Sequence, residues 1–224
     1  LEIFTYEHGR HKGLIRGIHS KNLRATIEPG NEVHVNWSGR LESHLGNFTI
    51  EPIKMWSSYI LNQRAKLLAV TTICSMIIST MAEKQQNILM YEKTLKLIKD
   101  ISRGEKDWIK NYIFWELDLL SEIGYGLDLS ECAVTARRDK LKYVSPSSGR
   151  AVTMEGAGSF KDKLFLLPEF FIDSSIDLTL ADIKNALVLT EYFFLKRFYE
   201  PNNLNFPKSR NHLKNILINE DKKY

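Results

Sequence analysis

Along the first 55 residues, hydrophobic and polar positions follow short, strand-like patterns. The segment EIFTY at residues 2–6 is rich in β-forming side chains, and the turn residues EHG separate it from a second such segment, GLIRGI. Farther on, Val33, Val35 and Trp37 alternate with polar residues, which is the period of a half-buried strand. The segment HLGNFTIEP predicts one more short strand. Several short strands with Gly-rich turns and no helix predict a small β-barrel or sandwich.

After Pro52 the hydrophobic spacing changes to that of helices. Apolar residues recur at helical spacing over residues 61–77, 88–101 and 105–123, and Gly124 is a suitable glycine to end the third helix. These three segments predict a mainly helical second part of the chain.

Residues 125–170 interrupt this helical part. They are rich in Ser, Gly and charged residues and contain two short strand-like segments, LKYVS and RAVTM. Helical spacing resumes at Thr179, a predicted N-cap with Asp182 three residues later, and a last helix is predicted to begin near Pro207. The chain therefore predicts an α+β protein with a loop-rich insertion in its helical part.

Composition narrows the class of protein without fixing its function. The 224 residues suffice for one large domain or two small ones, and a hydrophobic content of 43% supports a core. A net charge of +4 is compatible with a polyanionic partner but does not require one. Cys74, in an apolar helical run, is expected to be a core thiol, and two cysteines make no disulfide framework, so a reducing cytoplasm is expected. No apolar run has the length of a membrane span, and the first residues do not have the pattern of a signal peptide.

The sequence contains none of the common catalytic motifs: no P-loop, GxGxxG, HExxH or GxSxG. His8 and His11 are spaced like two metal ligands, but no nearby Cys or Asp completes a site, so a solvated turn is the favoured interpretation. Glu116 and Asp118 lie two residues apart on a predicted helix and therefore point to different faces. We expect no catalytic residue, no metal and no other cofactor.

A basic segment near the start is the most informative chemical feature. No acidic residue occurs between Glu7 and Glu28, whereas five basic residues do, and we call them the basic ribbon: Arg10, Lys12, Arg16, Lys21 and Arg24. Lys and Arg neutralise phosphates whatever the sequence of a nucleic acid. The basic ribbon therefore favours nucleic-acid binding, although an ordinary solvated surface has the same pattern. Trp37 and Phe48 are candidates for base stacking and equally for the interior of a barrel.

Several longer segments, taken in order, are together specific. They are EHGRHKGLIRG and PGNEVHVNWSGRLESHLGNFTIEP, then YIFWELDLLSEIGYGLDLSECAVT and LKYVSPSSGRAV, and finally FLLPEF, ALVLTEYFFLKRF and PKSRNHL. The first two resemble the N-terminal OB-fold of the RecO family, the bacterial mediators of DNA repair and recombination. The middle two resemble the helix leading into the small inserted module of that family and the strand pair of the module. The last three resemble its closing helical part, and the likeness is greatest to the α-proteobacterial form.

The resemblance implies an α+β fold with two domains. Residues 1–55 would form an N-terminal OB-fold β-barrel that binds DNA, and residues 56–224 an α-helical domain with a small zinc-finger-like module inserted at about 126–160. Relative to the family, the first strand or two of the barrel are expected to be missing from this chain. Many family members hold zinc with four cysteines in the module, but here Cys132 stands at the first ligand position, Thr135 at its partner's, and SGRAVTM offers no cysteine. The module is therefore expected to be metal-free.

The resemblance also implies a non-enzymatic function in DNA repair and homologous recombination. Such a protein binds single- and double-stranded DNA, anneals complementary strands and recognises the C-terminal tail of the single-stranded-DNA-binding protein. Together with RecR it helps RecA to replace that protein on single strands, in the RecF/RecO/RecR pathway. It would be cytoplasmic, at the bacterial nucleoid, without contact to a membrane.

Two sets of basic residues follow as site predictions. DNA phosphates would be contacted by the basic ribbon and, as a weaker candidate, Arg40, through charge and not sequence readout. An acidic protein tail that ends in an apolar residue needs an apolar pocket with cations at its rim, for which the candidates are Arg137, Arg138, Lys196, Arg197 and Arg210. Two other interpretations stay open: an OB-fold RNA-binding module, and a protein adaptor whose basic ribbon docks an acidic protein.

Overall fold

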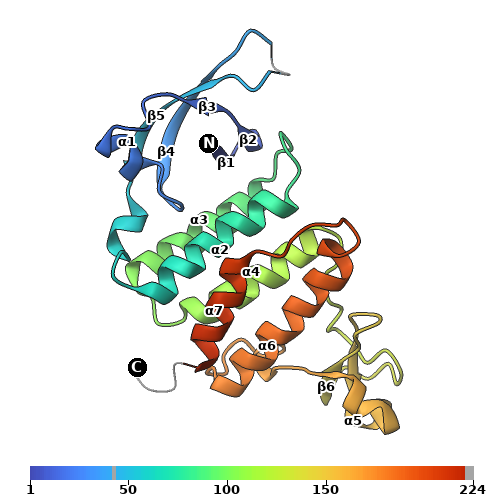
Figure 1. Cartoon of the computed structure of the whole chain (residues 1–224). Helices are drawn as coiled ribbons and strands as arrows, with labels where there is room; N and C mark the ends of the chain where they lie inside the picture. Colours follow the sequence, from blue (N-terminus) through green and yellow to red (C-terminus); the bar gives the residue numbers. More distant parts are fainter. Residues whose placement is uncertain (42–43, 220–224) are drawn as a thin grey trace. The chain divides into compact units, whose positions relative to one another are not determined.

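A computed structural model describes residues 1–41 and 44–219 of the chain. It contains two compact units: unit 1 is Leu1–Trp108 with Pro207–Leu213, and unit 2 is Ile109–Phe206 with the chain from Lys214 onward. Unit 1 contains two long helices as well as the N-terminal strands (Figure 1). The compact units therefore do not coincide with the predicted division into 1–55 and 56–224, which stays a prediction. Positions 42, 43 and 220–224 of that division lie outside the described residues.

The N-terminal strands of unit 1 form two sheets. The first pairs β1 (Glu2–Thr5) antiparallel with β2 (Gly9–Lys12). The second has β5 (Asn47–Lys54) in the middle, antiparallel to β4 (Glu32–Ser38) and parallel to the short β3 (Leu14–Ile15). The alternation predicted from the sequence is confirmed in β4, where the odd-numbered side chains from position 33 to 37 are partly buried and the even-numbered ones are exposed.

The outer edge of β2 is covered by the connection between α2 (Arg64–Thr80) and α3 (Ile88–Arg103). Arg10 forms a β-bridge with Glu83, and the Arg10 carbonyl accepts the N–H of residue 84 at 2.7 Å. Gly9 permits this approach, because it has a φ of 62° and a Cβ there would lie 1.8 Å from the carbonyl oxygen of residue 85.

The described residues show no closed barrel of the kind that the family resemblance implied. β2 has β1 on one side and the α2–α3 connection on the other, so no strand ladder within the described residues joins the two sheets into a barrel. The N-terminal strands of these residues form two separate sheets. The predicted α+β order, in which N-terminal strands are followed by helices, is confirmed.

Two long helices follow the strands in unit 1, as the hydrophobic spacing predicted. In α2, Ile73 and Met76 are completely buried. The side chain of Asn87 caps α3 by accepting the N–H of Met90 at 2.9 Å. A third helix, α1 (Lys21–Thr26), was not predicted, because six residues are less than two turns and show no amphipathic period.

The main helices of unit 2 are α4 (Trp108–Glu122) and α6 (Leu180–Phe193), and α6 continues into a π-helical turn, η4 (Phe194–Tyr199). The predicted cap of α6 is confirmed as a capping box: the Thr179 hydroxyl accepts the Asp182 N–H at 3.1 Å, and the Asp182 carboxylate accepts the Thr179 N–H at 3.1 Å. The last helix, α7 (Lys208–Asn219), begins directly after Pro207, as predicted.

Glu116 of α4 is a structural residue. Its side chain is fully buried, and its carboxylate accepts hydrogen bonds of 2.6 Å from the hydroxyls of Tyr112 and Thr190. Buried polar groups require such partners, because an unsatisfied one would destabilise the fold. The bond from Thr190 joins α6 to α4 inside unit 2.

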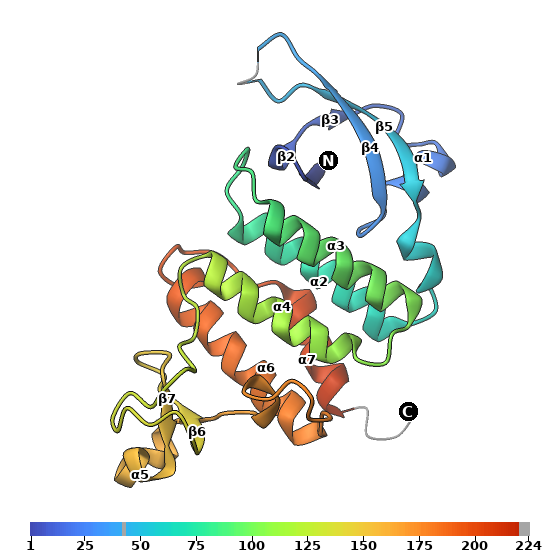
Figure 2. The same cartoon turned by 180° about the vertical axis from the view of Figure 1, so that it is seen from behind.

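The predicted insertion folds as a small module of unit 2 (Figure 2). Its sheet has the order β7-β6-β8, and its helical turns follow β7 and β8. The elements are β6 (Leu141–Val144), β7 (Ala151–Thr153), α5 (Met154–Ala157), η2 (Gly158–Lys163), β8 (Phe165–Leu166) and η3 (Glu169–Phe171). Cys132, Tyr143, Val152 and Ala157 form a core of their own, so packing of apolar side chains holds this module.

We predict that Gly9→Ala destabilises the protein by more than Gly17→Ala does. Both glycines have left-handed backbones, with φ of 62° and 78°, so each substitution costs about 1–2 kcal/mol of backbone strain. At Gly17 a Cβ has open space, with its nearest neighbour 4.0 Å away, whereas at Gly9 it meets the α2–α3 connection. The clash adds about 1–3 kcal/mol for Gly9→Ala alone. Urea unfolding of the two variants measures the difference, and equal destabilisation would contradict the docking of β2 on this connection.

Candidate nucleic-acid interface

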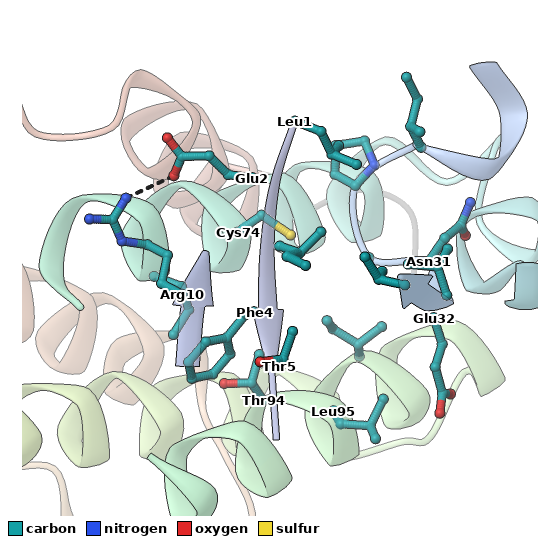
Figure 3. A pocket seen from close by; sticks show the side chains of 18 of the residues that line it. Leu1, Glu2, Phe4, Thr5, Arg10, Asn31, Glu32, Cys74, Thr94 and Leu95 are labelled. Atoms are coloured by element: carbon teal, nitrogen blue, oxygen red, sulfur yellow. Dashed lines mark hydrogen bonds and ion pairs between the residues drawn. The ribbon is translucent and has the colours of Figure 1, made fainter. Parts of the chain in front are cut away.

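Two residues of the basic ribbon, Arg10 and Lys12, lie on β2 and are held by carboxylates. The Arg10 side chain is 13% exposed, and its Nη1 donates to Glu2 Oε2 at 2.9 Å (Figure 3). Its Nε donates to the carbonyl of Met81 at 2.9 Å. Lys12 Nζ lies 3.6 Å from a carboxylate oxygen of Glu2 and 3.6 Å from one of Glu83. Arg10 therefore fastens β1 and β2 to the end of α2, and we leave it out of the proposed DNA contacts.

The other three residues of the basic ribbon are exposed, and we call them the α1 cations: Arg16, Lys21 and Arg24. Arg16 lies in the loop between β3 and α1, and Lys21 and Arg24 lie one turn apart on α1. Arg24 Nε donates to the carbonyl of Ile18 at 3.0 Å, which ties the loop to the helix. Within residues 1–41 and 44–219, no carboxylate pairs with any of the three, so their charges face solvent uncompensated.

Arg40 lies in the connection from β4 to β5, next to the two positions that the structure leaves undescribed. Its side chain is exposed, and no carboxylate of the described residues pairs with it. It is therefore a further cation on the strand region of unit 1.

The two aromatic candidates for base stacking lie inside unit 1. Phe48 is 5% exposed, and the ring of His11 lies 5.6 Å from its ring and 5.9 Å from the ring of Trp37. Trp37 donates from its indole nitrogen to the carbonyl of Leu45 at 3.2 Å. The pKa of His11 is lowered, chiefly by burial and also by Lys84. The sequence left two roles open for these rings, base stacking and packing in the interior. The contacts favour packing in the interior.

A second group of cations and aromatic rings, which was not predicted from the sequence, lies at the turn after β5. This turn, η1 (Trp56–Tyr59), brings the Trp56 ring close to Lys54 of β5 and to Lys99 and Arg103 of α3, and the Tyr59 ring close to Lys54. The lysine and arginine of α3 are four residues apart and therefore lie on the same face of the helix. This spacing is the sequence pattern from which their proximity could have been predicted.

A cavity of about 530 Å³ lies in unit 1 (Figure 3). Its lining is mostly apolar and comes from β1, β4, α2 and α3, with Thr94, Glu32 and Cys74 among the polar groups. Burial raises the pKa of Cys74 to about 11, so its thiol is not a nucleophile at neutral pH. The cavity is therefore a space between packed elements, and we assign it no chemistry.

The five candidates for partner binding have different environments. Arg137 makes two hydrogen bonds to Asp139, of 2.9 and 3.0 Å, and Lys196 Nζ lies 2.8 Å from Glu200. Arg197 donates to the carbonyl of Ser147, whereas Arg210 is fully buried and offers no charge at the surface. We therefore drop Arg210 from this set.

Arg138 differs from the other four, because it is exposed and has no ion pair among the described residues. The structure thus does not bring all five cations to the rim of one pocket.

Comparisons with known proteins agree on one family. Residues 1–56 match the family model described as recombination protein O N terminal, and residues 61–204 match recombination protein O C terminal. The chain is 34% identical over 219 residues to the DNA repair protein RecO of Cereibacter sphaeroides. The aligned region covers 97% of this chain and 90% of that protein. It is 35% identical over 223 residues to RecO of Brucella melitensis, with coverage of 97% and 87%. For RecO of Roseobacter denitrificans the identity is 36% over 195 residues, with coverage of 86% and 79%. These relatives are α-proteobacterial, as the resemblance predicted.

The surroundings of Cys132 do not fit a zinc ion. Its Sγ accepts N–H groups from Thr153 at 3.2 Å and Thr135 at 3.4 Å, and it lies 3.5 Å from the Thr153 hydroxyl. In the described part of the chain, no three His, Cys, Asp or Glu side chains are grouped so that they could hold a metal. The same part contains no helix with the length and apolar character of a membrane span.

Hydrogen bonds make Cys132 an acidic thiol. Burial alone raises the pKa of this thiol, but the hydroxyl and N–H groups of Thr135 and Thr153 outweigh burial and lower the pKa from 9.0 to about 6. The folded chain therefore favours the thiolate more than the unfolded chain does.

We predict that Cys132 makes the stability of the protein depend on pH between 6 and 8. The unfolded chain binds more protons in this range, so the contribution of the thiolate is lost as pH falls through about 6 and grows as pH rises toward 9. The free energy of unfolding of the parent, minus that of Cys132→Ser, should increase from pH 6 to pH 8. For the control Cys74→Ser the same difference should not increase, because the pKa of Cys74 is raised. A flat difference for Cys132→Ser would show that its thiol stays protonated.

Proposed function

This chain belongs to the RecO family of DNA repair proteins, and we propose that it binds DNA through the α1 cations and promotes annealing of complementary strands. The observation that supports this proposal most directly is the exposure of Arg16, Lys21 and Arg24 without carboxylate partners in the described residues. A cation that no carboxylate compensates can replace the counterions of a phosphate, and the released counterions favour binding.

The contrast with β2 supports this choice of residues. Arg10 and Lys12 lie near Glu2 and Glu83, so a phosphate would have to compete with carboxylates at 2.9–3.6 Å. The α1 cations meet no such competition, and Arg40, in the β4–β5 connection, is a further exposed cation without a carboxylate partner among the described residues. Contacts of this kind position a nucleic acid without reading its sequence.

Strand annealing follows from the same electrostatics. Two complementary strands are polyanions and repel each other over roughly a Debye length, about 10 Å at 0.1 M salt. A protein surface that neutralises phosphates without covering the bases lowers this repulsion and leaves base pairing to the strands. No nucleophile–base pair or metal cluster is needed for this function, and we propose that the protein is not an enzyme.

We further propose the partners that the family resemblance implies. They are single- and double-stranded DNA, RecR and the acidic C-terminal tail of the single-stranded-DNA-binding protein, with RecA acting downstream on single strands. Arg138 is the preferred contact for an acidic tail among the original candidates, because Arg137 and Lys196 already have carboxylate partners. The site of action would be the bacterial nucleoid in the cytoplasm, and the module would act without zinc.

We predict that the triple variant Arg16→Ala, Lys21→Ala, Arg24→Ala loses DNA affinity and annealing. A matched control, Lys161→Ala, Lys163→Ala, Lys184→Ala, removes three exposed cations from unit 2, so both variants have a net charge of +1, that is +4 minus 3. At low salt the first variant should bind oligonucleotides about tenfold more weakly or worse, and the slope of log K against log salt should fall by about 2 for single strands.

The readouts are fluorescence anisotropy at several salt concentrations and annealing of oligonucleotides coated with single-stranded-DNA-binding protein. The control variant should bind and anneal like the parent. Equal losses in both variants would mean that net charge matters and position does not. A folded parent that neither binds nor anneals DNA would contradict the proposal and favour a protein adaptor.

A further inference from the structure

The turn after β5 holds two aromatic rings in different environments. Trp56 is 6% exposed, and its indole N–H donates to a carboxylate oxygen of Glu32 at 3.1 Å, which fixes the ring. Tyr59 is 52% exposed, and its ring centroid lies 6.1 Å from that of Trp56 at an interplanar angle of 36°. The three-residue spacing in a 3₁₀ turn places both side chains on one side. A fixed ring therefore supports a second ring that faces solvent.

Three cations gather around these rings. The distances to the Trp56 ring centroid are 5.5 Å for Lys54 Nζ, 5.8 Å for Lys99 Nζ and 5.6 Å for the guanidinium carbon of Arg103. Lys54 Nζ also lies 5.1 Å from the ring centroid of Tyr59. Two of the cations come from the C-terminal half of α3 and one from β5, so tertiary packing brings them together (Figure 1).

The cations exceed the carboxylates at this place. Glu32 Oε2 lies 3.9 Å from Lys99 Nζ, while Lys54 and Arg103 have no ion pair within the described residues. The aromatic faces attract cations but carry no net charge, so they do not cancel the mutual repulsion of three positive groups. Phosphates would cancel it.

Packing alone accounts for part of this arrangement. Lysine and arginine stems often cover a buried ring, which explains Lys99 and Arg103 over Trp56. It does not explain Tyr59, whose ring is half exposed and has an uncompensated lysine over it. Exposed aromatic rings beside cations are the usual platform for single-stranded nucleic acids, since bases stack on the ring and phosphates meet the charges.

We propose that Tyr59, with Lys54 and Arg103, forms a second DNA contact that takes an unpaired base and its adjacent phosphates. This inference rests on the proposed DNA-binding function and adds a preference for single strands. A duplex keeps its bases stacked inside the helix, so the Tyr59 ring gains contact with a base only when the strand is single. The α1 cations would hold phosphates of either form, and the Tyr59 site would discriminate between them.

The test compares Tyr59→Ala with Tyr59→Phe in the full chain. Tyr59→Ala removes the ring and should weaken binding of an oligothymidylate by about tenfold, while duplex affinity changes by less than twofold. Tyr59→Phe keeps the ring and should bind both forms like the parent. Because the side chain is half exposed, both variants should fold, and circular dichroism and thermal unfolding verify this before binding is compared.

Crosslinking gives a second and independent readout. An oligonucleotide with 5-iododeoxyuridine, irradiated with the parent protein, should label the tryptic peptide of residues 55–64, which lies between Lys54 and Arg64 and contains Trp56 and Tyr59. The label should disappear from this peptide in Tyr59→Ala, and labelling confined to other peptides would overturn the inference.

The outcomes separate this inference from the proposed function. If the parent binds DNA and Tyr59→Ala binds single strands like the parent, the Tyr59 site is refuted and DNA binding through the α1 cations stands. If Tyr59→Ala loses single- and double-strand affinity equally, base stacking is refuted as well. If the folded parent binds no DNA, the proposed function itself is refuted.

Discussion

The ion pair between Glu2 and Arg10 determines how the first part of this protein is built and which of its charges are available. Arg10 reaches Glu2 on β1 and the Met81 carbonyl at the end of α2, so a single guanidinium connects a strand pair to a helix. Its backbone also bridges to Glu83. The outer edge of β2 is occupied by these contacts, so no further strand pairs with it among the described residues. The cavity in unit 1 is lined by strands of both sheets.

The same pair divides the basic ribbon into two functional parts. Charges on β2 lie within 2.9–3.6 Å of carboxylates and contribute to packing, whereas Arg16, Lys21 and Arg24 lie on and before a short helix with no carboxylate partner in the described residues. The five residues of the basic ribbon look alike in the sequence, but in the fold they differ in whether a carboxylate lies beside them. Unit 1 thus carries two chemically different groups of cations, and we propose that the α1 cations contact a phosphate backbone and that the group at Trp56 and Tyr59 contacts an unpaired base.

Unit 2 stabilises its polar interior with hydrogen bonds where a metal or an ion pair would be an alternative. Cys132 accepts two backbone N–H groups and has the Thr153 hydroxyl nearby. Glu116 similarly accepts hydroxyl groups from Tyr112 and Thr190 within the helical core. In both places a buried polar group is surrounded by hydrogen-bond donors, which lowers the cost of burying it.

The sequence by itself determined the features that depend on residues a few positions apart. The alternation in β4, the capping box of Thr179 and Asp182, the long helices and the family were all predicted, because each needs only local periodicity, capping chemistry or collinear order. Tertiary structure decided which cations have carboxylate partners, whether the strands close into a barrel, and where Trp56 contacts Lys99. Arg10 and Met81 are 71 positions apart, and no local pattern reports a contact of that separation. α1 was not predicted because its six residues are too few to show a helical period in the sequence. So short a helix depends on packing for its stability.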